Sequence, residues 1–184
     1  MKFQYASDLH LEFDDNYYFL MESNLVPSAP YLILAGDIDI IMSNQVTRMS
    51  YFEFLSKNWE QVFIIPGNHE FYKKGDVSKS FNIDIAIFPN VRYLNHQKLH
   101  IDGIDFFFTT LWSRTGTSII KNMIADFRQC KYGDGAFKYK QHDELHRKAV
   151  SWLSRELNKE MKVELNILEN EFLVGFFDRH TKMV

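Results

Sequence analysis

Three short apolar runs, each followed at once by polar residues, constrain the fold of this chain more than any other feature. The second and third runs are typical of strands that are buried on both faces of a parallel sheet. The carboxyl ends of such strands lie side by side, so the polar residues that follow them are expected to share one crevice. The runs and their polar followers are Phe3–Ala6 with Asp8, Leu9 and His10, Tyr31–Ala35 with Gly36 and Asp37, and Val62–Ile65 with Gly67, Asn68, His69 and Glu70.

A β-α-β unit is predicted between the second and third runs. Ser43 or Asn44 can cap a helix that ends near Asn58. Such crossovers are right-handed and imply that the flanking strands are parallel. The apolar stripe of this helix consists of Val46, Met49, Phe52 and Leu55.

Further elements are predicted downstream from the same kinds of pattern. The dipeptide Asp102-Gly103 lies between two apolar segments and favours the type I′ turn of a hairpin, which begins a second sheet. The other predicted elements are a helix over 77–88 ended by Pro89, a strand over 91–94, hairpin strands over 98–101 and 104–109, and helices over 118–127 and 141–159.

The residue types at the three strand ends are those that bind divalent metals. Carboxylates, an amide oxygen and imidazoles suit Mn, Fe and Zn, and a carboxylate can bridge two ions. Taken singly, each residue has an equally good structural interpretation as a turn cap or a partly buried polar group. Taken together at successive strand ends, they favour a metal site that holds one or two ions.

At these residues the chain resembles the calcineurin-like metallophosphoesterases. The signature of that family runs D-x-H, then G-D, then G-N-H-[D/E], each after a strand, and all three motifs are present here in order. The resemblance implies an α/β fold, a four-layer αββα sandwich, and a single domain over residues 1–184. In looser form it continues to about residue 159, through Phe107 to Trp112, Ala125-Asp126-Phe127 and Trp152-Leu153.

The resemblance also implies a role for each motif residue. Asp8 and His10 would bind a first metal, Asp37 would bridge two metals, and Asn68 would bind the second through its amide oxygen. Two such ions hold a hydroxide in line with the leaving group of a phosphoester. His69 would be the general acid or would stabilise the transition state. The implied activity is phosphoester hydrolysis, and monoesters, diesters and nucleotides all remain open as substrates.

Of two acidic residues near these motifs, one is assigned a supporting role and the other no role in the site. Glu70 completes the third motif, and it is expected to accept hydrogen bonds that support the loop. Family members often carry an acidic residue three positions after the Asp of the second motif, but Ile40 occupies that place here. Asp39 lies one residue earlier, and it is interpreted as a solvated loop residue.

The carboxyl end departs from the family pattern. The family continues with a His-containing motif and then G-H-x-H, whereas residues 161–184 contain a single histidine, His180, without either motif. The sandwich is therefore predicted to be incomplete at this end, and turnover is expected to be low or absent because in-line geometry depends on both metals. A truncated product, a degenerate paralogue and a site completed by another subunit remain open alternatives.

The strongest alternative function is a non-catalytic scaffold that keeps the fold and binds another protein. The intact early ligands favour the enzyme, and the missing late ligands favour the scaffold. A nuclease is weaker, because the formal net charge of −3 gives no basic field for nucleic-acid phosphates. Duplex nucleic acid is therefore not an expected partner.

The remaining histidines are interpreted as ordinary residues. His142 and His146 stand four apart on a predicted helix, but a zinc peptidase needs Glu directly after the first His, and Asp143 is there instead. A solvated helix face is the better interpretation of this pair. His96 and His100 flank a predicted strand and are interpreted as surface residues.

Composition and the ends of the chain predict the compartment and the oligomeric state. A single cysteine, Cys130, a start that moves straight into a strand, and the absence of an apolar run of about 18 residues predict a cytoplasmic protein without a membrane partner. The incomplete second sheet would expose an apolar face. Either a homodimer or a tail that packs Leu165, Leu168, Phe172 and Phe176 is expected to cover it.

Overall fold

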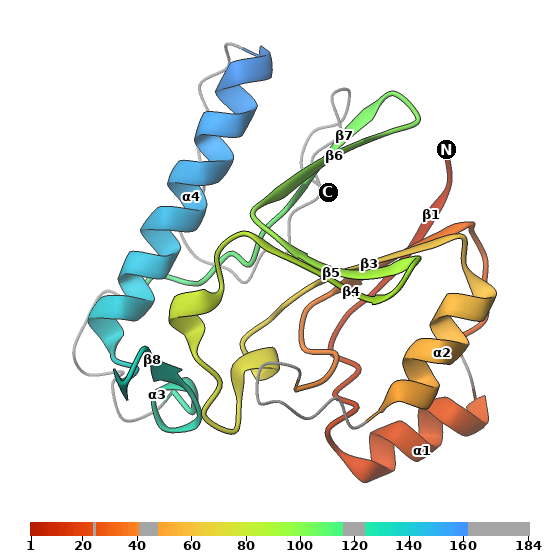
Figure 1. Ribbon diagram of the computed structural model, residues 1–184, viewed down its shortest axis with the longest axis horizontal. Coiled ribbons are helices and arrows are strands. Elements are labelled where there is room, and N and C mark those ends of the chain that lie inside the picture. The colour runs from red at the N-terminus through yellow and green to blue at the C-terminus, as the bar shows by residue number, and fades with distance from the viewer. Residues whose placement is uncertain (24, 41–47, 116–123, 162–184) are drawn as a thin grey trace.

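The computed structural model of the protein describes residues 1–23, 25–40, 48–115 and 124–161. Figure 1 shows strands at the centre, helices α1 and α2 on one side of them, and the long helix α4 at the other end of the molecule. In chain order the elements are β1 (Phe3–Ala6), α1 (Asp14–Ser23), β2 (Tyr31–Ala35), α2 (Met49–Asn58), β3 (Gln61–Ile65), the 3₁₀ helices η1 (His69–Phe71) and η2 (Val77–Lys79), β4 (Ile83–Phe88), β5 (Val91–Asn95), β6 (Gln97–Ile101), β7 (Ile104–Phe108), α3 (Asp126–Gln129), β8 (Lys131–Tyr132), β9 (Gly135–Ala136) and α4 (Tyr139–Met161).

A five-stranded sheet in the order β1-β2-β3-β5-β4 forms the framework (Figure 1). β1, β2, β3 and β5 are parallel, and β4 is an antiparallel edge strand. The three strands predicted from the apolar runs, and their parallel pairing, are therefore confirmed. In the register of β1, β2 and β3, Ala6 pairs with Leu34 and Ala35 pairs with Ile65. The strands end nearly level, so the polar runs emerge at the same edge.

Alternate residues of the central strands bury their side chains on opposite faces of the sheet. Leu34 and Ile64 join the core beneath α2. Ile33 and Phe63 join a second core on the opposite face. The pattern matches the prediction that these strands are covered on both sides, and it leaves their carboxyl ends as the place where polar groups can gather.

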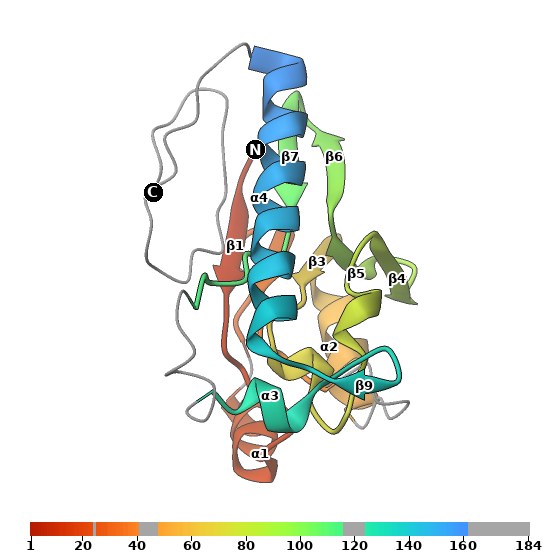
Figure 2. The ribbon, with the colours of Figure 1, turned by 90° about the vertical axis from the view of Figure 1, so that its left-hand side faces the viewer.

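The hairpin of β6 and β7 and then helix α4 add two further layers. Phe106 and Phe108 of β7 pack toward the five-stranded sheet. Phe107, which points the other way, packs against Leu153 and Leu157 of α4. Figure 2 shows α4 running lengthwise in front of β7. The layers are helix, sheet, hairpin and helix, in agreement with the predicted αββα plan.

The turn of this hairpin is the one that Asp102-Gly103 predicted. Asp102 has φ of 50° and Gly103 has φ of 82°. A type I′ turn requires positive φ at both central residues, and its twist matches that of the flanking strands. Ile101 and Ile104 pair across it.

The helix predicted over 77–88 is wrong. Only Val77–Lys79 forms a helical turn, and Ile83–Phe88 is strand β4. Asp76 caps the start of this turn, because its carboxylate accepts a hydrogen bond from the Ser78 N–H at 3.0 Å. The alternation of isoleucines over 83–87 has the period of a strand, and β5 supplies the antiparallel partner.

Other predicted helices agree in part. Helix α4 contains the whole segment predicted over 141–159. Within the described residues α2 begins at Met49, and the predicted cap residues Ser43 and Asn44, with Val46, lie outside them. The helix predicted over 118–127 overlaps α3, but residues 116–123 also lie outside. The tail over 162–184, with the packing expected of it and with His180, is outside too.

Two histidines interpreted as solvent-facing are buried, which corrects those interpretations. His96 is 6% exposed, and its ring stacks on Phe81 with centroids 4.6 Å apart. His142 is 3% exposed and packs edge-on against Trp112. His146, also on α4, donates a ring N–H to the carbonyl of Trp112. Aromatic neighbours from distant segments provide this burial.

Replacing His96 with phenylalanine is expected to make stability less dependent on pH. Burial, with a smaller contribution from Arg155, lowers the pKa of His96 from 6.5 to about 4. Between those values the unfolded chain binds a proton at His96 and the folded chain does not, so stability is lost as the pH falls through that window. From about pH 7.5 to about pH 5, the wild type should lose roughly 1 to 2 kcal/mol more than His96→Phe.

Urea unfolding of both proteins at the two pH values measures this difference. His142, whose pKa is also lowered by burial, is present in both proteins and cancels in the comparison. Equal losses of stability in the two proteins would contradict the prediction.

None of the helices within the described ranges combines the length and the apolar composition that a bilayer crossing requires.

Candidate metal centre

The first two polar runs are joined by backbone hydrogen bonds beyond the ends of β1 and β2. The Asp8 N–H donates to the Gly36 carbonyl at 3.0 Å, and the His10 N–H donates to the Asp37 carbonyl at 3.0 Å. Asp8, His10 and Asp37 have φ of 57°, 48° and 56°. Non-glycine residues in this left-handed region are uncommon and cluster at functional sites. The chain is thus held in a strained path where its polar side chains gather.

Gly67 lets the second and third polar runs approach closely. A Cβ at this position would lie 2.7 Å from the backbone nitrogen of Asp37 and would collide with the Asp37 side chain as well. Because backbone cannot yield as a flexible side chain does, any other residue here would push the two loops apart. The glycine of the third motif is therefore explained by the closeness of the loops.

Glu70 links these two loops through hydrogen bonds to its buried carboxylate. Its side chain is fully buried and accepts hydrogen bonds from the N–H groups of Asp37 at 3.1 Å, Ile38 at 2.8 Å and Gly67 at 2.7 Å. Burial and the negative charge of Asp37 raise the pKa of Glu70 to about 8, while the backbone donors favour the carboxylate. Glu70 thus links both loops through one carboxylate.

Asp8, His10 and Asp37 converge at the edge of the sheet. Each offers a ligand atom, and these atoms lie within 4.8 Å of one another. Asp37 Oδ1 also accepts the backbone N–H of His69 at 3.0 Å. Burial raises the pKa of Asp37, although the N–H and the charge of His69 act in the opposite direction. Two carboxylates and one imidazole are thereby presented to the same small volume.

Asn68 is oriented by a contact with α3. Its amide nitrogen donates to Asp126 Oδ1 at 2.8 Å and to the Tyr72 hydroxyl at 3.2 Å. The Tyr72 hydroxyl donates to the same carboxylate oxygen at 2.8 Å. Because the amide nitrogen is engaged, the amide oxygen is the end of Asn68 available to a metal ion. Asp126 was named in the looser resemblance but was given no role, and here it supports Asn68.

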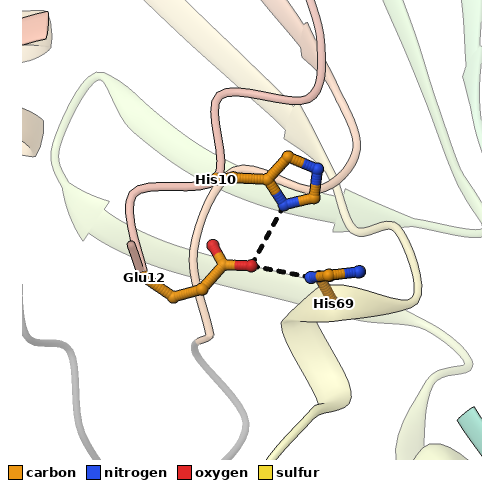
Figure 3. A group of neighbouring side chains, drawn as sticks. All are labelled: His10, Glu12 and His69. Atoms are coloured by element: carbon orange, nitrogen blue, oxygen red, sulfur yellow. Dashed lines mark hydrogen bonds and ion pairs between the residues drawn. The ribbon is translucent and has the colours of Figure 1, made fainter. Parts of the chain in front are cut away.

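Glu12 joins the two histidines of the site, as Figure 3 shows. Its Oε1 atom lies 3.0 Å from His10 Nδ1 and 2.6 Å from His69 Nδ1. The Glu12 side chain is 6% exposed, and the two imidazole rings are 4.5 Å apart between centroids. His10, Glu12 and His69 form a second group whose ligand atoms lie within 4.8 Å of one another.

The surroundings of His69 favour its charged form. Burial works against a charged ring, but the hydrogen bond with Glu12 and the charge of Asp37 outweigh it and raise the pKa of His69. The pKa of Glu12 is lowered, because hydrogen bonds with His69 and His10 outweigh the effect of burial. His69 also stacks on Tyr72, with centroids 4.0 Å apart. The ring is therefore held from one edge and one face.

Sequence reasoning missed Glu12 and misplaced Asp39. The signal for Glu12 was its place two residues after His10, in the run Asp8-Leu9-His10-Leu11-Glu12. Asp39 was interpreted as solvated, and this is wrong, because it is 0% exposed. Its Oδ1 accepts the N–H of Ile40 at 2.8 Å, and burial raises its pKa to about 6. Asp39 is therefore a buried carboxyl near the site.

The residues present fit a divalent metal ion. The two groups share His10 and together provide carboxylate and imidazole donors, which suit Mn, Fe and Zn. One buried carboxylate oxygen, Glu12 Oε2, has no hydrogen-bond partner among the described residues. Buried polar atoms are seldom left without a partner, so this oxygen is open to an interaction with a further group.

A protein-family model also matches this chain. The model described as calcineurin-like phosphoesterase matches residues 1–174. This match includes all three strand-end motifs and extends beyond residue 159, where the looser likeness of sequence was expected to end.

Two individual proteins are similar to the chain. The uncharacterized protein L509 of Acanthamoeba polyphaga mimivirus is 30% identical over 62% of this chain and 45% of its own length. The crystal structure of phosphopantetheinyl hydrolase from Mycobacterium tuberculosis superposes with a TM-score of 0.54 and 17% identity, covering 86% of this chain and 63% of the hydrolase. The second likeness establishes the fold only. The chain spans less than two thirds of either protein.

Proposed function

The chain belongs to the calcineurin-like phosphoesterase family, and on this premise we propose that it hydrolyses a phosphoester with bound divalent metal. One observation carries the proposal: Asp8, His10 and Asp37 present their ligand atoms within 4.8 Å of one another at the ends of adjoining strands. We assign Asp8 and His10 to a first ion, Asp37 to a bridge between two, and Asn68 to the second. Such ions neutralise charge on the phosphoryl group and activate water.

His69 is proposed to give a proton to the leaving oxygen. Its Nδ1 is engaged by Glu12 at 2.6 Å, so Nε2 is the atom available to substrate. The raised pKa of His69 favours the form of the ring that also carries a proton on that atom. A general acid must lie within hydrogen-bond reach of the leaving group. The hydrogen bond from Nδ1 to Glu12 fixes the ring and leaves Nε2 for that contact.

The residues of the site leave the class of phosphoester and the identity of the metal open. The motif residues act on the phosphoryl group, so monoester, diester and nucleotide substrates all fit the proposal. Mn, Fe and Zn all fit the donor set.

Metal analysis of the purified protein, together with assays on a phosphomonoester and a phosphodiester with added Mn²⁺, tests the proposal. We expect bound metal and hydrolysis that stops when a chelator is added and returns with Mn²⁺. Absence of bound metal after Mn²⁺ is added would contradict the assignment of the site. Bound metal without any hydrolysis would contradict the enzymatic function.

A non-catalytic scaffold is the second candidate, and exposed aromatic side chains favour it. Tyr18 and Phe19 on α1 are 60% and 66% exposed, and Tyr5 on β1 is 71% exposed. Aromatic side chains are enriched at protein interfaces. The scaffold predicts metal binding without turnover, and it predicts that replacing Phe19 weakens capture of a protein partner without changing metal affinity.

A further inference from the structure

We propose that Glu12 is a positioning residue that sets the orientation and tautomer of both histidines at the site. In this arrangement Nδ1 of His10 and Nδ1 of His69 each carry a proton directed at Glu12, and Nε2 of each ring is turned away from it. The inference rests on the phosphoesterase function proposed above. It adds a residue that lies outside the three strand-end motifs.

The geometry that carries this inference is the sharing of one oxygen. Glu12 Oε1 is 2.6 Å from His69 Nδ1 and 3.0 Å from His10 Nδ1. An ionised carboxylate accepts hydrogen bonds and cannot donate them, so each Nδ1 must be the donor. Figure 3 shows Nε2 of both rings on the side away from the carboxylate. One buried oxygen thereby selects the same tautomer in two rings.

Each ring then presents the atom that its task requires. With the proton of His10 on Nδ1, Nε2 keeps the lone pair that a metal ligand needs. When His69 gives its Nε2 proton to the leaving oxygen, the ring that remains is the neutral tautomer with its proton on Nδ1. Glu12 already holds that form. Carboxylates that orient metal-bound imidazoles commonly raise metal affinity by about 10- to 100-fold.

Two other interpretations of Glu12 are separable from this one. Glu12 could itself be a metal ligand, because its carboxylate belongs to the second group of ligand atoms with His10 and His69. It could instead support the loop without affecting the rings. A glutamine at position 12 distinguishes these cases, because its amide oxygen still accepts hydrogen bonds but is a much poorer metal ligand than a carboxylate.

Proton–nitrogen NMR of the histidine rings in the metal-free protein is the first test. In the neutral form of each ring, the wild type should show the proton at Nδ1. In Glu12→Ala both should move toward protonation at Nε2, and in Glu12→Gln both should stay mainly at Nδ1. Glu22→Gln, which makes the same chemical change at an exposed position of α1, is the matched control and should leave both tautomers unchanged.

Metal titration and kinetics are the second test. Glu12→Ala should bind Mn²⁺ about 10- to 100-fold more weakly and lose kcat with little change in KM, and Glu12→Gln should recover most of both losses. Unchanged tautomers in Glu12→Ala would overturn the inference. So would a Glu12→Gln variant that loses metal as completely as Glu12→Ala, because Glu12 would then be a ligand.

The two proposals fail in different measurements. A wild type without metal-dependent hydrolysis would contradict the phosphoesterase function. The tautomer shift in Glu12→Ala, with its reversal in Glu12→Gln, would still support the positioning of the rings. Hydrolysis by the wild type, together with tautomers that do not change in Glu12→Ala, would support the phosphoesterase function and contradict the positioning of the rings.

Discussion

A His69→Ala variant is expected to turn over a phosphoester roughly 10²- to 10⁴-fold more slowly than the wild type, as is typical when a general acid is removed. The loss should be largest for alkyl phosphates, whose leaving oxygen needs a proton, and smaller for para-nitrophenyl phosphate. Metal affinity should be nearly unchanged, because the ring of His69 is assigned to the substrate. Steady-state kinetics with both substrates and calorimetry with Mn²⁺ measure these effects.

His100→Ala is the matched control for this variant. The His100 side chain is 62% exposed on β6 and pairs with Asp105, so its loss should leave turnover unchanged. If His69→Ala lost metal and activity in proportion, His69 would be a ligand and the proton-transfer role would be wrong. An equal loss for both substrates would also count against proton transfer to the leaving oxygen.

An Asp37→Ala variant is expected to lose both metal and turnover. The ligand atoms of Asp37, Asp8 and His10 lie within 4.8 Å of one another, and Asp37 is proposed to bridge two ions. Loss of an outer partner of a metal ligand typically costs about 10- to 100-fold in affinity, so loss of a bridging ligand should cost more. Calorimetry with Mn²⁺ and the hydrolysis assay give the two measurements.

Asp134→Ala, in the exposed turn between β8 and β9, is the control for the loss of one negative charge. Circular dichroism is needed as well, because Asp37 Oδ1 also accepts the His69 N–H. A folded Asp37→Ala protein that binds Mn²⁺ as the wild type does would refute the bridging assignment.

The parts of the fold that could be predicted depend on neighbours in the sequence. Tyr31–Ala35 is apolar at every position, so both of its faces had to be covered, and α2 on one side and the β6–β7 hairpin on the other cover them. Asp102-Gly103 carries its own turn geometry, which is why the hairpin could be placed to within a residue. The strand-end motifs were recognisable for the same reason, since each is a continuous run.

The parts that could not be predicted depend on residues far along the chain. Glu12 meets His69 across 57 residues, and no local pattern indicates that contact. The burial of His142 comes in part from Trp112, which packs on it from a separate segment. Ile83–Phe88 was predicted to be helical, because its antiparallel pairing with β5 is not visible in the local sequence. Helix α1 has no well-separated apolar face, and it was not anticipated.

The close approach of the two loops at Gly67 affects which positions of such a sequence can change during evolution. A ligand such as Asp8 can be exchanged while the loops stay in place, because its task is to hold a metal. A side chain at Gly67 would meet the Asp37 backbone, so no change of residue at position 37 makes room for it. In a lineage that no longer needs the site, the ligands can drift first. The glycine, which binds nothing, should be the most durable mark of the ancestral centre.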